Sequence, residues 1–431
     1  MSVSVDGLAG RLAREVGDSS VSADEPARSG HAVDGLHPRV ICRPADPAQI
    51  AAILRICGEE GAAVTPWGGG TAIGLGNVPH RVDIVLQTDR LASLGEHDDA
   101  NLTATVQAGM PIGVLNERLA ARRQFLALDP PRPDLATVGG IVAANTNGPR
   151  RMSYGGVRDL VIGMRMVLAG GEEIKAGGKV VKNVAGYDMC KLFTGSLGTL
   201  GIITEVTFKM APRPEAAATI LARGPAGAPM HVVDELFASV LQPAAITVSN
   251  ALDDLPSGAQ ALAVAAEGFT EAVDRHLRDV QALAAGAGMS VEVLRGPDHE
   301  ALWARLRDFP TGGSSPAAES VIRLTVPLAS VGAALEVVGT LPGRVTYVAH
   351  AASGAVFIRL PAAGTAEVFT VLTDAARIHR GHAVLFAAPP EVKRGRDVWG
   401  PPPPALVLMR EIKRQFDPHN LLNPGRFVAF I

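Results

Sequence analysis

The organisation of this chain follows from one glycine-rich stretch, which reads Pro66-Trp67-Gly68-Gly69-Gly70-Thr71-Ala72-Ile73-Gly74-Leu75-Gly76. Five glycines fall within nine positions, directly after the apolar run Ala62-Ala63-Val64. Because glycine has no Cβ, consecutive backbone N–H groups can turn toward one point and surround a bulky anion such as a pyrophosphate. The alternative is a plain flexible loop, since glycine clusters mark loops more often than ligand sites.

The common phosphate-loop patterns do not match this stretch. A Walker loop ends in Gly-Lys-Ser or Gly-Lys-Thr, whereas this one ends in Gly-Leu-Gly. The dinucleotide fingerprint requires glycine at its first, third and sixth positions, and Ile73 occupies the sixth. Alone, the stretch favours a ligand only slightly, so the inference depends on two further glycine-rich segments downstream.

Composition and charge exclude several classes of protein. The chain has 431 residues and a formal net charge of −3, which offers no electrostatic reason to expect nucleic acid as a partner. No apolar run reaches the roughly 18–20 residues of a transmembrane helix, and the N-terminus lacks the apolar core of a signal peptide. We therefore expect a cytoplasmic protein of two or three domains. Its three cysteines, Cys42, Cys57 and Cys190, are too few for an iron–sulfur cluster, which generally needs four.

A strand–helix–strand unit precedes the glycine-rich stretch. Val40-Ile41-Cys42 is typical of a strand, and Asp46-Pro47-Ala48-Gln49 is a helix-start pattern. Gly61 is a natural helix end, and the residues from 62 to 65 form the next strand. This is the context expected of a ligand-binding loop.

Two more glycine-rich segments follow. The second runs from Asp134 to Gly148 and consists of small residues, so either another group approaches its backbone closely or it is a tightly packed helix. Residues 159–175 have the pattern of a hairpin. The third segment, 195–208, has glycine at every third position before a β-branched strand, and Ala211 to Glu215 suggests a domain boundary. Beyond it, alternating strands and helices over 217–385 predict an α+β sheet with helices on one face.

The three segments together resemble a known superfamily. Pro-Trp-Gly-Gly-Gly-Thr at 66–71 is followed by Thr-Val-Gly-Gly-Ile-Val-Ala-Ala-Asn at 137–145, Tyr154-Gly155, and Gly-Ser-Leu-Gly-Thr-Leu-Gly-Ile-Ile-Thr-Glu at 195–205. In this order they resemble the FAD-binding domain of the vanillyl-alcohol oxidase / p-cresol methylhydroxylase (PCMH-type) superfamily. The closing pattern, Phe416-Asp417-Pro418 with Asn423-Pro424-Gly425-Arg426, is typical of its FAD-linked oxidases. Lys182 to Asp188 and Leu197 make the chain most similar to the FAD-binding E subunit of bacterial glycolate oxidase.

The resemblance implies a fold class and a domain order. The class is α+β, with a PCMH-type two-lobed FAD-binding domain followed by an α+β cap domain whose sheet is mainly antiparallel. We expect an N-terminal helix and mobile segment over 1–32, the FAD-binding domain over 33–215 and the cap domain over 216–399. A C-terminal helix and tail over 400–431 would return to the FAD-binding domain.

The resemblance also implies which residues hold FAD. The first loop would wrap the pyrophosphate, the second segment would line the phosphates and flavin, Tyr154-Gly155 would close the channel, and the third would hold the adenine end. These residues are Trp67, Gly68, Gly69, Gly70, Thr71, Thr137, Gly139, Gly140, Asn145, Tyr154, Gly155, Gly198, Ile202 and Ile203. Asn423 is a further candidate that would reach back toward the flavin.

The chain departs from the superfamily pattern at several positions. Covalent members usually carry a histidine in the first loop, and the match here is Gly69-Gly70-Thr71, which predicts non-covalent FAD. The 2-hydroxy-acid dehydrogenases usually have glutamate where this chain has Leu197, and they tend to carry histidine-rich metal motifs in the cap. His350 and the pair at 379 and 382 do not form such a motif, so we interpret them as structural or surface residues and expect no metal. The catalytic residues stay unassigned.

The function implied by the resemblance is an FAD-binding subunit of a multi-subunit 2-hydroxy-acid (glycolate) oxidase. Its substrate would be a small 2-hydroxy acid, and its partners a catalytic flavin subunit and an iron–sulfur subunit that receives the electrons. Such partners leave open a peripheral position at the inner membrane. Two alternatives remain, namely a catalytically silent FAD-binding scaffold needed for assembly and a stand-alone FAD-linked dehydrogenase.

Overall fold

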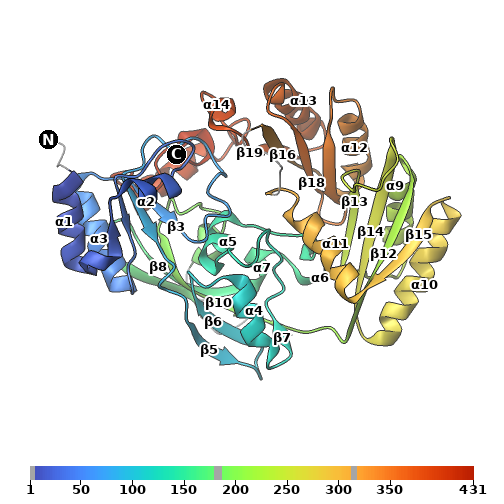
Figure 1. Ribbon diagram of the computed structural model, residues 1–431, viewed down its shortest axis with the longest axis horizontal. Helices are drawn as coiled ribbons and strands as arrows, with labels where there is room; N and C mark the ends of the chain where they lie inside the picture. The colour runs from blue at the N-terminus through green and yellow to red at the C-terminus, as the bar shows by residue number, and fades with distance from the viewer. Residues whose placement is uncertain (1–4, 179–186, 312–317) are drawn as a thin grey trace.

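The structure is a computed structural model that describes residues 5–178, 187–311 and 318–431. Residues 182–186, which belong to the segment from Lys182 to Asp188 that resembles the glycolate oxidase E subunit, lie outside these ranges. Figure 1 shows the N-terminal lobe on the left and the sheet of residues 216–387 on the right, with the C-terminal segment returning to the left-hand lobe.

The glycine-rich stretch follows a small sheet, as expected. Its strand order is β1 (Val21–Ser22), β2 (Val40–Cys42), β4 (Ile84–Gln87) and β3 (Val64–Trp67). Strands β2 and β3 both run parallel to β4. Helix α3 (Pro47–Glu60) connects β2 to β3. The helix begins at the predicted cap, where Asp46 accepts a hydrogen bond from the backbone N–H of Gln49 at 2.8 Å. It ends at Gly61, whose φ of +61° suits glycine.

The N-terminal segment is more regular than expected. Helix α1 (Val5–Val16) buries Leu8 and Leu12 against α3. The segment that we expected to be mobile contains η1 (Asp18–Ser20), strand β1 and α2 (Glu25–Gly30). Pairing of β1 with β2 orders this part of the chain, and such long-range pairing leaves no signal in the segment's own composition.

A second, antiparallel sheet completes the N-terminal lobe. Its strand order is β5 (Leu94–Asp98), β6 (Thr103–Gln107), β10 (Ile202–Lys209), β8 (Val161–Val167) and β9 (Glu173–Gly177). The hairpin expected over 159–175 is β8 with β9. Shorter elements surround the sheet, namely α4 (Ile112–Ala120), β7 (Gln124–Phe125), α5 (Val138–Ala144), α6 (Arg151–Tyr154), α7 (Val157–Leu160), α8 (Met189–Phe193) and β11 (Ala211–Pro212). Helices α4 and α5 share one hydrophobic core with β6, β8 and β10.

The remaining large sheet is antiparallel throughout, and we call it the cap sheet. Its strand order is β15 (Ser290–Arg295), β12 (Ala216–Pro225), β14 (Ala259–Gly268), β13 (Ala245–Ser249), β17 (Thr346–His350), β18 (Ala355–Pro361), β16 (Glu319–Thr325) and β19 (His382–Ala387). Alternate residues of β12 enter different cores, because Ile220 packs on one face and Leu221 on the other. Both faces of the sheet are therefore apolar and need cover.

Helices cover the two faces of the cap sheet unequally. One face packs against α9 (Ala228–Ala238), α10 (Thr270–Gly286), α12 (Val331–Gly339) and α13 (Thr365–Ile378). The other face carries α11 (Gly296–Asp308), and Figure 1 shows this helix on the side nearer the N-terminal lobe. The expectation of helices on one face is therefore correct for four helices and wrong for α11. The expected α+β class with a mainly antiparallel cap sheet is confirmed.

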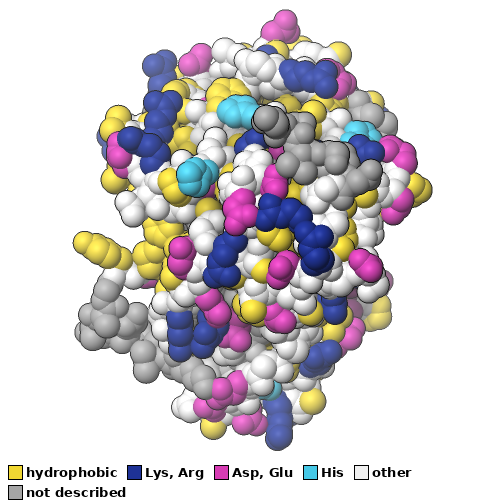
Figure 2. All heavy atoms as spheres, turned by 90° about the vertical axis from the view of Figure 1, so that its left-hand side faces the viewer, with side chains coloured by type: hydrophobic (Ala, Val, Ile, Leu, Met, Phe, Trp, Pro, Cys, Tyr) yellow, Lys and Arg dark blue, Asp and Glu magenta, His cyan; other side chains and the backbone are white. Residues whose placement is uncertain are grey.

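The C-terminal segment packs on the N-terminal lobe. After α14 (Pro390–Lys393) and α15 (Leu406–Phe416), the tail runs beside β3, where Val64 N–H donates to Leu421 O at 2.8 Å and Asn423 N–H donates to Val64 O at 3.0 Å. Figure 2 shows the left-hand face of the molecule, where acidic and basic side chains are interspersed. Within the described ranges, no helix is long and apolar enough to cross a membrane.

Candidate functional site

The three glycine-rich segments meet around one cleft of about 780 Å³, measured out to its mouth, which we call the cofactor cleft. The first loop comes from the end of β3, the second segment forms α5, and the third leads into β10. The two interpretations of the second segment are both correct, because it is a packed helix of small residues and also a wall of the cleft.

Eleven of the expected cofactor-binding residues line the cofactor cleft. They are Trp67, Gly68, Gly69, Gly70, Thr71, Thr137, Gly139, Gly140, Gly198, Ile202 and Ile203. Asn423, the further candidate from the C-terminal tail, also lines it. The sequence reasoning missed several other lining residues, including Thr88, Ala108, Ala143, Ala144, Gly201 and Arg426.

The other three expected residues are not among those that line the cleft. Asn145 ends α5 with a φ of +49°, and its side-chain oxygen accepts a hydrogen bond from Asn147 at 3.1 Å. Tyr154 donates from its hydroxyl to Glu267 on cap strand β14 at 2.8 Å, so its ring lies where the lobe and the cap meet. Gly155 follows it with a φ of +83°. The hydrogen bond joins residues 113 positions apart, so the motif Tyr154-Gly155 by itself could not reveal this contact with the cap.

The glycines of the cofactor cleft are required by close backbone approach. A Cβ on Gly68 would lie 2.0 Å from the Thr137 hydroxyl oxygen, and a Cβ on Gly69 would lie 1.7 Å from the Leu135 carbonyl oxygen. Gly198 has a φ of +66°, which side chains disfavour. The first loop is therefore pressed against the segment that leads into α5, and the cleft wall there is backbone rather than side chain.

Among the described residues, two uncharged buried polar atoms of the cofactor cleft lack a hydrogen-bond partner, and so does Nη1 of Arg426, which lies 3.6 Å from Asp34. The Thr137 hydroxyl and the Asn423 side-chain oxygen are buried without a hydrogen bond. The other polar end of Asn423 is satisfied, because its amide nitrogen donates to Leu197 O at 2.6 Å. Burying an unpaired polar group costs free energy, so such atoms indicate a missing partner. Together with the backbone-lined wall, they fit a phosphate-bearing dinucleotide such as FAD.

The lining residues also bear on how a flavin would attach. Covalent flavin links use side chains with a nucleophilic atom, and the described residues that line the cleft include no histidine, cysteine or tyrosine. Gly69-Gly70-Thr71, which match the segment where covalent members of the superfamily usually carry a histidine, lie in the wall of the cleft. The geometry is therefore compatible with the predicted non-covalent cofactor.

Thr137→Val is expected to separate cofactor binding from folding. Removing a hydroxyl that has no protein partner should leave the stability of the FAD-free protein unchanged or slightly higher, because no protein hydrogen bond is lost. The same change should weaken FAD binding about tenfold if the hydroxyl meets the cofactor. Both quantities can be measured, the first by thermal unfolding and the second by fluorescence titration with FAD.

A matched control is Thr373→Val on α13, whose hydroxyl donates to Phe369 O at 2.7 Å far along the chain from the cleft. This variant should lose a little stability and keep full FAD affinity. Unchanged FAD affinity in Thr137→Val would contradict the assignment of its hydroxyl to the cofactor.

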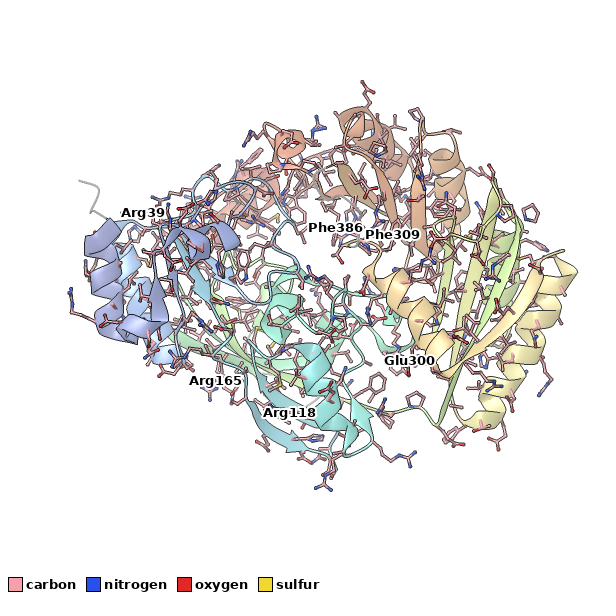
Figure 3. All side chains as sticks on the ribbon, viewed as in Figure 1. Arg39, Arg118, Arg165, Glu300, Phe309 and Phe386 are labelled. Atoms are coloured by element: carbon pink, nitrogen blue, oxygen red, sulfur yellow. The ribbon has the colours of Figure 1, made fainter. Side chains whose placement is uncertain are left out.

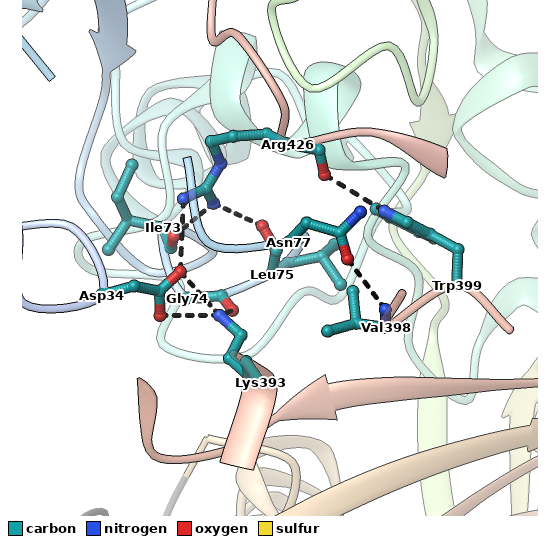
Figure 4. Close-up of polar contacts among 9 residues, drawn as sticks. All are labelled: Asp34, Ile73, Gly74, Leu75, Asn77, Lys393, Val398, Trp399 and Arg426. Carbon is teal, nitrogen blue, oxygen red and sulfur yellow. Dashed lines mark hydrogen bonds and ion pairs between the residues drawn. The ribbon is translucent and has the colours of Figure 1, made fainter. Parts of the chain in front are cut away.

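A buried charged cluster holds the far end of the first loop (Figure 4). The Lys393 ammonium, on α14, donates to both carboxylate oxygens of Asp34 at 2.6 and 2.7 Å and to Gly74 O at 2.8 Å. Arg426 donates to the carbonyl oxygens of Ile73 and Leu75 and lies 3.6 Å from Asp34. Burial lowers the pKa of Lys393, and the Asp34 carboxylate opposes that shift. We call Asp34, Lys393 and Arg426 the Lys393 cluster.

Next to the Lys393 cluster, Asn77 ties the loop to the C-terminal segment. Its amide nitrogen donates to Phe427 O at 2.9 Å, and its oxygen accepts from the Val398 N–H at 2.8 Å. Residues more than 300 positions apart in the sequence therefore fix the path of the glycine-rich loop. No pattern in the loop itself predicts these partners.

The histidines considered at the sequence level lie in different surroundings. His350 is buried, and burial lowers its pKa to about 4, so it is neutral at pH 7. Its Nδ1 lies 3.1 Å from the Thr247 hydroxyl. Of the two interpretations given above, structural or surface, His350 is therefore a structural residue. His382 is exposed at the start of β19, and the described part of the chain contains no cluster of groups that could hold a metal ion.

Comparison with known families identifies two matching segments. Residues 38–177 match the model of an FAD-binding domain, and residues 401–427 match that of the C-terminal domain of FAD-linked oxidases. The chain resembles p-cresol methylhydroxylase with substrate bound, with a TM-score of 0.73 at 17% identity, covering 98% of this chain and 96% of that one. At this identity the likeness shows the fold alone.

Curated relatives include both kinds of glycolate oxidase subunit. The chain is 29% identical to glycolate oxidase subunit GlcD of Bacillus subtilis, over 91% of this chain and 89% of that protein. It is 41% identical to subunit GlcE of Escherichia coli, over 29% of this chain and 36% of that protein. A D-lactate dehydrogenase of Archaeoglobus fulgidus is 38% identical over 40% of this chain and 39% of its own length. The expected likeness to the E subunit thus covers part of the chain, and the likeness to a D subunit runs nearly end to end.

Proposed function

The chain is an FAD-dependent oxidoreductase with a PCMH-type FAD-binding domain, and we propose that it oxidises the CH–OH group of a small 2-hydroxy acid as one subunit of a glycolate-oxidase-like complex. The observation that carries the proposal is the cofactor cleft, with its backbone wall and its unpaired Thr137 hydroxyl. Relatives named as glycolate oxidase subunits and as a D-lactate dehydrogenase support the substrate class.

The chain's own residues would bind and orient the cofactor. The first loop and α5 would hold the pyrophosphate through backbone groups, with the Thr137 hydroxyl and the Asn423 oxygen as side-chain contacts. When bound, the flavin supplies the acceptor for the hydride that leaves the α-carbon of the substrate. Non-covalent attachment and the individual residue roles are part of this proposal.

The route of the electrons beyond the flavin is the finer part of the proposal. An iron–sulfur cluster generally needs four cysteine ligands, and this chain has three. All three are buried, and they do not lie close together in the sequence. We therefore assign the next step to a partner subunit that carries a cluster, with a second flavin subunit beside it. A cytoplasmic location, with membrane contact only through such partners, belongs to the same proposal.

A visible absorption spectrum tests the cofactor assignment. The purified chain should show a flavin band, and after acid precipitation the band should move to the supernatant, because nothing links the flavin covalently. A band that stays with the pellet would contradict the non-covalent part. No band after FAD is added back would favour the silent scaffold.

Anaerobic titration of the holoprotein tests the reaction. Glycolate and D- and L-lactate should each be added to the chain alone and to the chain co-purified with its partners, while the flavin band is followed. Bleaching by at least one acid is expected in the complex. Bleaching without any partner would favour the stand-alone dehydrogenase, and none in either sample would refute a catalytic flavin in this chain.

A further inference from the structure

A second, smaller cavity lies between the N-terminal lobe and the cap sheet, and we call it the cap cavity. It is narrow: about 350 Å³ of space there includes open solvent, and only about 20 Å³ can take the centre of a water-sized molecule. Its lining includes Ala144, Arg307, Arg323, His350, Phe357 and Phe386. Ala144 at the end of α5 also lines the cofactor cleft, so the two spaces adjoin across this residue. Figure 3 shows Phe309 and Phe386 near the middle of the molecule, on this side of the cap sheet.

Arg323 is the unusual residue of the cap cavity. It lies on β16, opposite Phe357 of β18 in the strand register, and its guanidinium lies 5.6 Å from the centre of the Phe386 ring. Its Nε is buried without a hydrogen-bond partner, and no ion pair of Arg323 is recorded among the described residues. The side chain as a whole keeps partial exposure, because it faces the cavity.

The charge of Arg323 is not neutralised by its surroundings. Burial, with the nearby Arg151 as a second cause, lowers its pKa to about 10, so the group stays protonated at pH 7. His350 is neutral there and supplies no counter-charge. None of the residues that line the cap cavity is acidic. The stretches outside the described ranges also contain no aspartate or glutamate.

Two other arginines of this region, Arg307 and Arg150, do have carboxylate partners. Arg307 makes a two-point contact with its neighbour Asp308, at 2.9 and 3.0 Å, and Arg150 lies 2.9 Å from Glu267. Arg323 lacks any such contact in the described part of the chain. Partly burying a cation without an anion is costly, so the presence of Arg323 here points to a ligand that supplies the negative charge.

We propose that Arg323 binds the carboxylate of a short-chain 2-hydroxy acid in the cap cavity. A guanidinium suits this task because its fork of N–H donors matches the two oxygens of a carboxylate. The rings of Phe357 and Phe386 limit the space, so the α-carbon of the acid can carry at most a small substituent beside its hydroxyl, and that of glycolate carries none. This assignment rests on the proposed function for its substrate class, and Arg323 would act there as the residue that recognises the substrate.

The first test measures binding without turnover, with oxalate as a non-reacting carboxylate and the FAD-loaded protein. Calorimetric titration should show a dissociation constant about 30-fold higher in Arg323→Met than in wild type, because a charged hydrogen-bonded contact is lost. Arg323→Lys should fall between the two, since it keeps the charge and loses the fork. Equal affinity of Arg323→Met and wild type, or no oxalate binding to wild type, would overturn the proposal.

A matched control is Arg223→Met, on strand β12 of the same sheet. Arg223 lies 2.7 Å from Asp254 and 3.0 Å from Glu292, so its charge is already paired within the protein. The control removes one cap-sheet cation but should bind oxalate within about twofold of wild type. A loss equal to that of Arg323→Met would show that any missing cation weakens binding, and would overturn a specific role for Arg323.

Thermal unfolding separates recognition from a structural role. Without a carboxylate ligand, Arg323→Met should be at least as stable as wild type, because an unpaired buried cation is removed. Oxalate should raise the melting temperature of wild type clearly more than that of the variant at the same concentration, because the variant binds it about 30-fold more weakly. A lower melting temperature in the ligand-free variant would indicate that Arg323 supports the fold instead.

The anaerobic titration distinguishes failure of this inference from failure of the proposed function. If 2-hydroxy acids bleach the flavin of Arg323→Met at the same concentrations as wild type, the function stands and the Arg323 assignment is wrong. If no 2-hydroxy acid bleaches wild type while oxalate binding still depends on Arg323, the carboxylate site stands and the proposed reaction is wrong.

Discussion

Replacing Gly69 by alanine is expected to weaken FAD binding by at least about 100-fold, a loss of close to 3 kcal/mol of binding free energy. A Cβ at this position would lie 1.7 Å from the Leu135 carbonyl oxygen and 2.6 Å from its carbon. Both are backbone atoms, so neither can rotate out of the way. The first loop must therefore move away from the segment that leads into α5. The flavin-to-protein absorbance ratio after gel filtration and an FAD titration of the apoprotein measure the effect.

Gly74→Ala is the matched control for this variant. It lies in the same loop, and a Cβ there would meet nothing within 4 Å. It should therefore keep wild-type FAD affinity. Circular dichroism of both apoproteins checks that each variant is folded. A folded Gly69→Ala protein with wild-type affinity would show that the close contact between the loop and Leu135 does not shape the cofactor site.

Replacing Lys393 by methionine is expected to destabilise the protein by about 3–5 kcal/mol, because it leaves a buried carboxylate without its main partner. The Lys393 side chain is fully buried, and the side chain of Asp34 is 5% exposed. Arg426 remains 3.6 Å away and offers only part of the lost interaction, and Gly74 O loses its donor. Methionine fills nearly the same volume, so the loss reports on charge and hydrogen bonding and not on a cavity. Equilibrium unfolding in urea measures it.

Lys175→Met on β9 is the control for removal of a lysine, because this residue is exposed. Its effect on stability should stay within about 0.5 kcal/mol. A loss below 1 kcal/mol in Lys393→Met would contradict the view that the Lys393 cluster anchors the glycine-rich loop. Because Lys393 contacts the carbonyl of Gly74, the same variant should also bind FAD more weakly than wild type.

The elements that the sequence located correctly carry their signals locally. Helix α3 begins at Asp46 and ends at Gly61 because capping depends on residues within one turn of the helix end. The sequence pattern indicates the cap strands β12, β14, β16, β17 and β18, and it did not reveal β13, β15 and β19. Strands β13 and β15 alternate apolar and polar residues over only four positions, Ile246 to Ser249 and Ser290 to Val293, and such short runs do not stand out as strands.

The candidate sites also differ in whether their residues carry a local signal in the sequence. The glycine-rich segments could be found from the sequence because a wall of closely approaching backbone requires glycine, and glycine is visible in the sequence itself. The role proposed for Arg323 could not be predicted, since an arginine in a strand has no distinctive neighbours in sequence, and His350 was interpreted only as a structural or surface residue. Their unusual state, an unpaired cation beside a neutral imidazole, exists only because β16 and β17 bring them to one cavity.

The sequence by itself determined the α+β class and, through its resemblance to the PCMH-type superfamily, the FAD-binding domain and most of the residues of the cofactor cleft; the motifs that carry the resemblance are glycine-rich because the cleft wall requires close backbone approach. The tertiary structure alone decided that Tyr154 contacts the cap, that Lys393 and Arg426 hold a loop more than 300 residues earlier, and that Arg323 has no counter-ion among the residues that the structure describes. The physical reason is that the cost of burying a charge, and the partner that offsets it, are set by distances in space between residues far apart along the chain.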